Sequence, residues 1–351
     1  MLKRLVLIII GAFFATCISA DPIVTSINGQ VSHGSSLNIY GSYFGEKTNP
    51  VPTIWDNAES GSVGDTWTCV LPTNSLEDVL RDTAYRTSAE AKKNSGWIVS
   101  QAHSHSTRFI CGGHGYSATD STRGPNVAVG KEIGQSDYLY CSFYYRTNAE
   151  WENSYLDNYK LWYYTGDCRT FAGSGFYVEF NPLPRSRPVY HFNGWTKITW
   201  DGLTASDPKD GWIKLEILYH NDSGSVDVYV YENNVLKKSQ ENTTHEQAGG
   251  CGDYITIGGF LRLINEPDGY MGHYWRYLDD IYVDTTWARV EIGNNPVWKN
   301  CTKREVQIPT AWATGEISIT VNQGSFSDEE TAYLFVVDSD GAASSGYQIT
   351  F

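Results

Sequence analysis

The chain has 351 residues, with 26 Lys and Arg against 40 Asp and Glu, and a net charge of −14 at pH 7. A surface this acidic repels nucleic acid and anionic membranes, which argues against both as partners, and it disfavours polyanionic glycans unless a local basic groove exists. The length suits two domains. Aromatic residues make up 14% of the chain, enough to fill a substantial core and still leave rings for a binding face.

The first twenty residues have the pattern of a secretory signal peptide. Lys3 and Arg4 precede an apolar run from Leu5 to Ala15, and Ala20 suits the cleavage site. The run is too short to span a bilayer, and no later segment is long and apolar enough to do so. We therefore expect residues 1–20 to be removed and the protein to be secreted or displayed at the cell surface, without a membrane span.

Six of the seven cysteines remain once Cys17 leaves with the leader, although a lipid anchor on Cys17 is a weaker alternative. An even number of cysteines in an exported chain favours disulfides, and the absence of a CxxC pair argues against a cysteine-built zinc site. Cys141 and Cys168 lie equally far from the middle of the polar segment 150–159, so a hairpin there would pair them. Buried free thiols are the alternative. Proximity in sequence suggests two weaker pairs, Cys69–Cys111 and Cys251–Cys301.

Alternating apolar and polar residues dominate the pattern of the chain and predict strands. One helix is expected, from Leu76 to about Thr87, where apolar residues recur at helical spacing behind a Ser75 cap. Short strands with regular turns and few helices indicate an all-β sandwich. The strands expected from the clearest alternation are 138–146, 212–220, 226–231, 254–257 and 277–283, with turns at 221–224 and 233–234.

Two patterns at the ends of the chain fit one immunoglobulin-like domain. The first consists of Pro22, Ile23, Ile27, Gly34, Leu37, Ile39, Gly41 and Phe44. It resembles the IPT/TIG family of immunoglobulin-like domains, but the family's usual continuation does not follow Gly45 and a matching one begins at Ala288. Residues 21–55 and 288–351 together have the length of one sandwich of about 100 residues. We therefore expect a split domain with an insertion; the alternative is that both ends extend one large sandwich.

The insertion, residues 56–287, resembles the concanavalin A-like jelly-roll superfamily of lectins, laminin-G-like modules, glucanases and polysaccharide lyases. The resemblance rests on Trp212–Tyr219, followed by a hairpin, and on Tyr277–Asp284 at the end of the insertion. It implies a jelly-roll β-sandwich that, in relatives, holds glycan on its concave sheet. The expected fold class is therefore all-β, a jelly-roll sandwich plus an immunoglobulin-like sandwich assembled from the two chain ends.

Acidic residues at the two ends of the insertion form a candidate calcium site. Asp56, Glu59 and Asp65 open the insertion, and Asp280 lies on its last strand. The first and last strands of such a sandwich are usually neighbours, so these carboxylates could converge, and calcium prefers six to eight oxygen ligands. The resemblance also implies a structural calcium ion here. The alternative is that these acids are solvated turn residues.

A Tyr-rich face beside Arg is amphipathic and is typical of a carbohydrate groove. Sugars stack their CH-rich faces on aromatic rings and need polar partners for their hydroxyls. Tyr140, Tyr144 and Arg146 share one side of a strand by alternation. The alternative is that the rings pack between layers of a sandwich. The candidate ligand-binding residues are Tyr140, Tyr144, Arg146, Lys160, Trp162, Tyr177 and Glu179.

Catalysis is less well supported than binding. The Glu-x-Asp-x-x-Glu motif of the glucanase branch is absent, and so are the usual motifs of jelly-roll alginate lyases. A lyase needs a base and a group that neutralises the uronate carboxylate. Candidates for those roles are Arg146, Tyr164, His191 and His220. The sequence thus favours a protein that binds a polysaccharide or glycoconjugate. A lyase acting on a uronate-containing glycan is the alternative, and a non-catalytic adhesion or structural surface module is the second alternative.

Overall fold

The structure is a computed structural model, and it describes residues 20–57, 84–87, 108–112, 127–134, 136–147, 156–165, 175–180, 190–192, 211–222, 225–244, 254–259, 261–263 and 276–351. Within these ranges every regular element is a β-strand except the short 3-10 helix η2 (Trp298–Asn300). The expectation of an all-β fold is therefore confirmed. Among the same residues no helix has the length and apolar character needed to cross a membrane.

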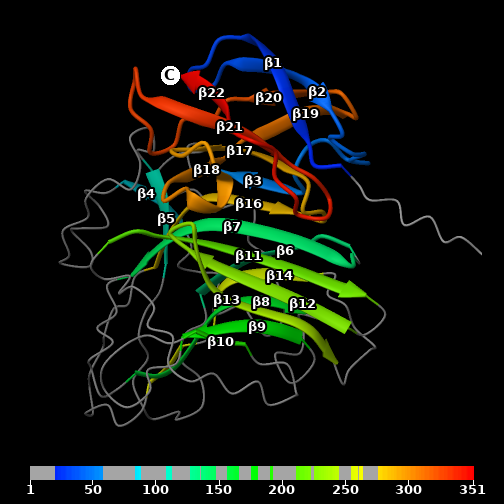
Figure 1. The fold of residues 1–351 in the computed structure, drawn as a ribbon. Coiled ribbons are helices and arrows are strands. Elements are labelled where there is room, and N and C mark those ends of the chain that lie inside the picture. Colours follow the sequence, from blue (N-terminus) through cyan, green and yellow to red (C-terminus); the bar gives the residue numbers. More distant parts are fainter. Residues whose placement is uncertain are drawn as a thin grey trace, which may run out of the picture.

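The strands form four antiparallel sheets that lie one above another, as Figure 1 shows from top to bottom. The upper pair, which we call the terminal sandwich, consists of β1 (Ile23–Gly29), β2 (Ser36–Ser42), β20 (Glu316–Thr320) and β19 (Ile308–Ala313), and of β18 (Arg304–Val306), β17 (Arg289–Gly293), β21 (Thr331–Val337) and β22 (Tyr347–Thr350).

The lower pair, which we call the central sandwich, has an eight-stranded and a six-stranded sheet. The eight-stranded sheet contains β13 (Val235–Thr244), β12 (Ser225–Glu232), β11 (Ile213–Asp222), β7 (Tyr138–Thr147), β16 (Arg276–Asp284), β5 (Arg108–Gly112), β4 (Ala84–Thr87) and β3 (Ile54–Asp56). The six-stranded sheet contains β10 (Tyr190–Phe192), β9 (Gly175–Phe180), β8 (Leu156–Thr165), β14 (Tyr254–Gly259), β6 (Val127–Glu132) and β15 (Leu261–Leu263).

Both ends of the chain build the terminal sandwich. β2 pairs with β20, so that Leu37 lies opposite Ile319 and Ile39 opposite Ile317. Alternate residues of these strands face the other sheet, where they meet Val290 and other apolar side chains of β17 and β21. The core consists of Leu37, Ile39, Phe44, Val290, Ile292, Ile317, Ile319, Val321, Phe326, Ala332, Leu334, Val336 and Ile349.

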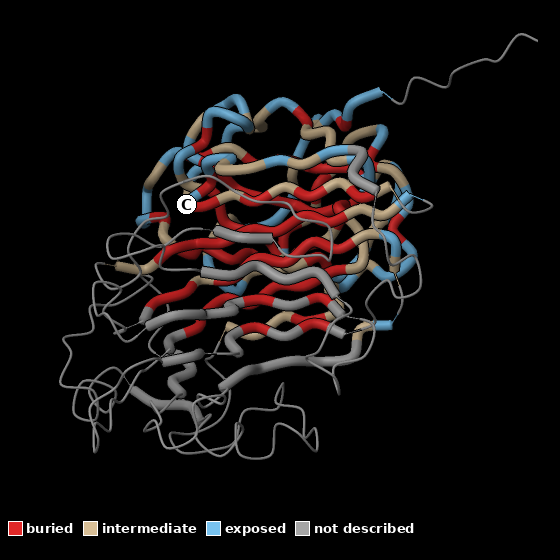
Figure 2. Tube along the Cα trace, turned by 90° about the horizontal axis from the view of Figure 1, so that it is seen from below, coloured by how far each residue is buried: buried red, intermediate tan, exposed pale blue. Residues whose placement is uncertain are grey.

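The central sandwich buries the odd-numbered side of β7 against the six-stranded sheet. Cys141 and Phe143 are fully buried there, and their cross-strand partners in β11, Ile217 and Leu215, are buried with them. Figure 2 looks along the stack of sheets and shows buried residues in the middle of the strands, with exposed residues at the rim of the described chain. Tyr140 and Glu216, which lie between the two sandwiches, are as buried as Cys141 and Ile217 in the central core.

Two chain crossings join the sandwiches, and an ion pair holds them together. Lys47 lies on the outgoing crossing and Asp284 at the start of the returning one, with Nζ and Oδ2 2.6 Å apart and both side chains almost fully buried. Burial raises the pKa of Asp284, and Lys47 offsets part of that rise. Trp287, on the returning crossing, donates its indole N–H to the carbonyls of Leu139 and Tyr219, each at 3.1 Å.

Most of the expected strands are confirmed, but the expected helix is wrong at its end. Residues 84–87 form strand β4, which pairs with β5, so pairing within the sheet overrides the local helical spacing. Residues 76–83 lie outside the described residues, as does the signal peptide up to residue 19. The domain boundaries at 55/56 and 287/288 remain a prediction. If residues 56–287 expressed alone gave only insoluble or unfolded protein, these boundaries would be wrong.

Candidate functional site

A layer of buried charge and aromatic rings joins the terminal sandwich to the eight-stranded sheet. We call this layer the seam. It lies on the even-numbered side of β7 and β11, opposite the apolar core of the central sandwich. Its members are Tyr140, Tyr144, Lys214, Glu216, Arg289, Glu291, Trp298, Arg304 and Glu305.

Ion pairs fill the seam, and the pair between Arg304 and Glu216 joins the two sandwiches. Arg304 Nη2 lies 3.0 Å from Glu216 Oε2, and its Nε lies 3.4 Å from Glu291 Oε2. Arg289 Nε lies 3.0 Å from Glu291 Oε1. Burial by itself raises the pKa of Glu291, but Arg289, Arg304 and Lys214 lower it more, so the net pKa lies well below its usual range. Glu291 is therefore held as a carboxylate between two guanidinium groups.

The tyrosines and Trp298 complete this network. Tyr140 donates its hydroxyl to Glu216 Oε1 at 2.8 Å, and Arg289 lies over its ring at 4.3 Å. Burial, followed by Glu216 and Glu291, raises the pKa of Tyr140 well above its usual value, so the phenol stays protonated. Trp298 donates its indole N–H to Glu291, and Tyr144 donates to Glu305 Oε1 at 2.9 Å.

The structure corrects the expectation that Tyr140, Tyr144 and Arg146 line an open groove. Tyr140 is 0% and Arg146 5% exposed, and the hydroxyl of Tyr144 donates a hydrogen bond to Glu305. The alternation that made this face amphipathic is real, but the hydroxyls of Tyr140 and Tyr144 bond to Glu216 and Glu305 instead of to solvent or a sugar. The sequence could not indicate this, because Glu291 and Glu305 of the terminal sandwich lie 151 and 161 residues further along the chain than Tyr140 and Tyr144.

Trp162 and Tyr164 belong to the core of the central sandwich and not to a shared groove. Both are buried, Tyr164 packs edge-on against Tyr219 with ring centroids 5.2 Å apart, and its hydroxyl donates to the Ser136 carbonyl at 3.0 Å. These rings approach the eight-stranded sheet from the side opposite to Tyr140. A single concave face carrying Tyr140 together with Trp162 is therefore wrong.

The described residues do not assemble the four lyase candidates into one site. His220 stacks on Tyr138 at 4.1 Å and lies 3.6 Å from the Asp227 carboxylate. Arg146 shares that side of the sheet but lies eight residues beyond Tyr138 along β7, about 26 Å away. Tyr164 belongs to the other sheet. The side chain of His191 lies outside the described residues.

The register of the six-stranded sheet brings four candidate residues together. Lys160 lies opposite Glu179, and Glu179 opposite His191, so one row crosses β8, β9 and β10. Tyr177 is in the neighbouring row, opposite Tyr163. Because cross-strand partners share a face and successive residues alternate, both rows lie on the face opposite to the one that carries Trp162 and Tyr164. We call them the outer rows.

Tyr163 is a member of the outer rows that sequence reasoning missed. Simple alternation through 160, 162 and 164 placed Lys160 and Trp162 on one side of the strand. A register shift between Lys160 and Trp162 reverses the parity, so Lys160 shares a face with Tyr163 instead. The apolar partners of the inward row, Val178 and Phe176, were the available signal, because they alternate with Tyr177 and Glu179.

The structure describes two of the four expected calcium ligands, Asp56 and Asp280. β3 pairs with β16 and places Asp56 opposite Ile281, next to Asp280, as expected for the first and last strands of the insertion. Asp280 is 7% exposed and has a φ of 45°, and its backbone N–H donates to Asp279 Oδ1. Where the chain is described, no three His, Cys, Asp or Glu side chains group closely enough to hold a metal. Glu59 and Asp65 lie outside the described residues, so the site remains a prediction.

Two cysteines with described side chains carry free, buried thiols. These are Cys141 and Cys301. Cys141 faces Trp162 within the central core, and burial raises the pKa of its thiol. This corrects the expected pairings of Cys141 with Cys168 and of Cys251 with Cys301, because neither thiol is bonded to a partner here. Cys69, Cys168 and Cys251 lie outside the described residues, as does the side chain of Cys111, so the Cys69–Cys111 pair remains a prediction.

Comparisons with known proteins give distant structural likenesses. No family model matches the chain, and no curated protein does. A β-glucanase catalytic domain of family GH131 from Podospora anserina is 10% identical at a TM-score of 0.40, covering 66% of this chain and 94% of its own. The alginate lyase Aly36B is 9% identical at a TM-score of 0.36, covering 60% and 95%. The lectin I of Ulex europaeus is 10% identical at 0.28, covering 59% and 93%. At these values the likeness assigns neither an activity nor a ligand.

Proposed function

We propose that the protein binds carbohydrate through the outer rows of the six-stranded sheet. The observation that carries the proposal is the register that gathers Tyr163 and Tyr177 beside Lys160, Glu179 and His191. Two neighbouring tyrosine positions supply rings for the CH-rich face of a sugar. The adjacent row supplies a cation, a carboxylate and an imidazole for its hydroxyl or carboxylate groups.

The other sheet faces of the central sandwich support this choice by elimination. One face of the eight-stranded sheet forms the core with Trp162 and Tyr164, and the other is closed by the seam. Among the residues that the structure describes, the outer face of the six-stranded sheet is therefore the sheet face of this sandwich that neither packing layer uses. A sheet face of this kind gives a rigid platform on which side chains hold a fixed spacing.

The same proposal has three further parts. They are export of the protein, a split immunoglobulin-like domain of IPT/TIG type, and a structural calcium ion at Asp56 and Asp280. In this proposal, the terminal sandwich presents the glycan-binding sandwich outside the cell. Residues 59 and 65 would complete a calcium site, which would stabilise the folded protein by about 2.7 kcal/mol at a hundredfold excess over the dissociation constant. Asp280→Ala would abolish that response in a thermal melt with added calcium.

A second candidate function is β-elimination on a uronate, favoured by the row that contains both Lys160 and His191. In such a reaction a base removes the proton next to the carboxylate, a cation neutralises that carboxylate, and the glycosidic oxygen takes up a proton and leaves as a hydroxyl group. The product is an unsaturated sugar with a strong ultraviolet absorbance. Lys160 would supply the positive charge and His191 or Tyr163 the base.

A glycan array followed by a titration with the best glycan tests the proposal. Tyr177→Ala and Glu179→Gln should each weaken binding about tenfold or more, since central contacts dominate recognition. Tyr144→Phe, which changes only the seam, should bind like the wild type. If Tyr177→Ala and Glu179→Gln bind unchanged, the outer rows are not the site. Release of ultraviolet-absorbing oligosaccharides by the wild type would replace the binding assignment with the lyase.

A further inference from the structure

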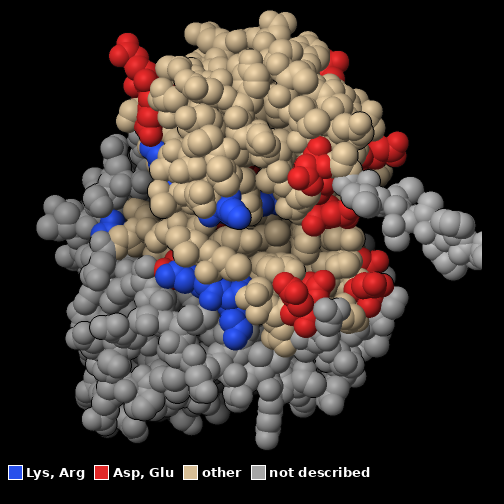
Figure 3. Space-filling model, in the orientation of Figure 1, with Lys and Arg blue, Asp and Glu red and all other residues tan. Residues whose placement is uncertain are grey.

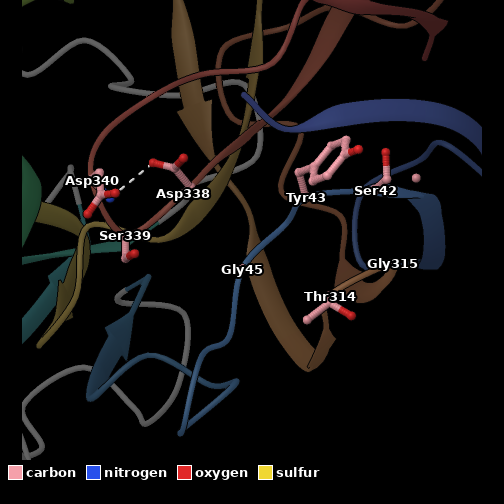
Figure 4. Close-up of a pocket in the computed structure, with 9 residues that line it drawn as sticks. Ser42, Tyr43, Gly45, Thr314, Gly315, Asp338, Ser339 and Asp340 are labelled. Carbon is pink, nitrogen blue, oxygen red and sulfur yellow. Dashed lines mark hydrogen bonds between the residues drawn. The ribbon is translucent and has the colours of Figure 1, made fainter. Parts of the chain in front are cut away.

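A cavity lies in the terminal sandwich, and none of its lining residues belongs to the outer rows or to the seam. Its volume is about 610 Å³, within the range of small-ligand sites. Figure 4 shows Asp338, Ser339 and Asp340 across the cavity from Tyr43, with the chain at Gly45 passing between them. The lining residues are Gly41, Ser42, Tyr43, Gly45, Thr314, Gly315, Asp338, Ser339 and Asp340.

Hydrogen bonds of the backbone hold the walls of this cavity in place. Gly41 N–H donates to the Gly315 carbonyl at 3.0 Å, and Phe44 N–H donates to the Thr314 carbonyl at 3.1 Å. On the opposite wall, Asp338 Oδ1 accepts the backbone N–H of Asp340 at 3.0 Å and that of Ala342 at 2.9 Å. The cavity is therefore formed in advance of any ligand, which lowers the cost of binding.

Tyr43 presents a large ring at the rim of the cavity. It is 58% exposed, the largest exposed fraction among the big apolar and aromatic side chains of the described residues. Its φ of 61° is in the left-handed region that most side chains avoid. Neighbouring Phe44 is fully buried in the core of the terminal sandwich and Tyr43 is not, so the ring of Tyr43 contributes nothing to that core.

The cavity carries negative charge and hydroxyl groups. Its lining includes two carboxylates and three hydroxyl-bearing residues besides Tyr43, and it includes neither Lys nor Arg. Burial, and then the neighbouring Asp340, raise the pKa of Asp338. On the face that Figure 3 shows, most acidic side chains of the described surface lie toward the right, while Lys and Arg side chains lie toward the middle and left. A bound cation would relieve the repulsion within the cavity.

We propose that this cavity binds an amino-sugar unit that carries a free ammonium group. The ring of Tyr43 suits the CH-rich face of the sugar, the carboxylates of Asp338 and Asp340 suit its ammonium group, and the hydroxyls of Ser42, Thr314 and Ser339 suit its own hydroxyls. The cavity would reject uronates because it offers them no positive charge. This site is independent of the outer rows, and its ligand has the opposite charge preference.

Calorimetric titration of the full-length mature chain with a glucosamine tetramer, near pH 6 where the amines are protonated, tests the proposal. Tyr43→Ala and Asp340→Asn should each weaken binding about tenfold, from the loss of ring contact or of one ion pair. Tyr43→Phe, which keeps the ring, should stay within about twofold of the wild type. Glu329→Gln is the matched control, because it removes an exposed carboxylate of the same sandwich that does not line the cavity.

The outcomes separate this site from the outer rows. Loss of binding in Tyr43→Ala and Asp340→Asn, with Tyr177→Ala unaffected, supports the cavity. Absence of binding by the wild type up to about 10 mM overturns the proposal, since weaker binding is not specific recognition. Equal weakening in Glu329→Gln also overturns it, because the tetramer would then respond only to overall charge. Asp340→Asn preserves the shape of the side chain, so the test stands even if Tyr43→Ala folds poorly.

Discussion

The two faces of strand β7 are both largely buried, yet they are built from different kinds of side chain. On β7, Leu139, Cys141 and Phe143 face the six-stranded sheet and pack as an apolar core. On the next residues along the same strand, Tyr140 and Tyr144 face the terminal sandwich and form hydrogen bonds with carboxylates. An amphipathic strand therefore need not have one face in solvent, because a second protein layer can supply the polar partners.

The two faces also differ in what fixes their geometry. Apolar side chains pack against any surface of suitable shape, whereas the carboxylates of Glu216 and Glu291 require guanidinium groups at defined positions. Buried ion pairs add little net stability compared with apolar packing, but losing one partner leaves the other charge buried alone. We therefore expect the seam to set the orientation of the terminal sandwich on the central one.

The largest effect should follow the removal of one seam charge. Glu291→Gln leaves Arg289 and Arg304 with Glu216 as the main remaining anion, and it should lower the free energy of unfolding by about 3–5 kcal/mol. Urea denaturation measures this loss, and Glu329→Gln serves as an exposed control that should change it by less than about 0.5 kcal/mol. A loss below about 1 kcal/mol in Glu291→Gln would mean that solvent reaches the seam.

The same carboxylate should give the protein part of its sensitivity to acid. The pKa of Glu291 is depressed in the folded state, so its contribution is present above the ordinary value near 4.5 and is lost as the pH falls below it. Through this group the free energy of unfolding changes by at most about 1.4 kcal/mol per pH unit, because one proton is involved. Asp284, whose pKa is raised, acts in the opposite direction.

The measurement is therefore the difference in unfolding free energy between wild type and Glu291→Gln, determined by urea titration at several pH values between about 3 and 6. The variant should lose less stability than the wild type as the pH falls through this range. Parallel curves for the two proteins would show that Glu291 titrates in the folded state as it does in the unfolded chain.

A smaller effect should separate stability from binding. Tyr144→Phe removes the hydrogen bond to Glu305 and should cost about 1 kcal/mol of unfolding free energy, because one part-buried hydrogen bond is lost while the ring remains. Its affinity for the glycan selected by the array should equal that of the wild type. A variant of unchanged stability but weakened glycan binding would return Tyr144 to the binding surface.

The smallest effect concerns the apolar face. Cys141 is fully buried and its pKa is raised, so iodoacetamide should leave it unmodified in the native protein at pH 8 and modify it after unfolding. Peptide mapping without reductant should find it as a free thiol. Recovery of a disulfide-linked peptide that joins residues 141 and 168 would contradict the structure.

Much of the fold could be predicted from local patterns, but the site could not. Alternation located strands such as β7 and β11 because each residue's face is set by its own strand. It could not locate the partner of the polar face, because Tyr144 and Glu305 are 161 residues apart in sequence. Nor could it show the register shift in β8 that moves Lys160 to the side of Tyr163.

Hydroxyl-radical footprinting of the native protein tests most directly whether the polar face of β7 is an internal seam. Tyr140 is fully buried, whereas Tyr43 is 58% exposed and supplies an internal reference of the same chemistry. The account predicts that Tyr140 and Tyr144 are oxidised far more slowly than Tyr43, and that unfolding in urea removes the difference. Oxidation of Tyr140 at a rate like that of Tyr43 in the native protein would contradict the account and reopen this face as a binding surface.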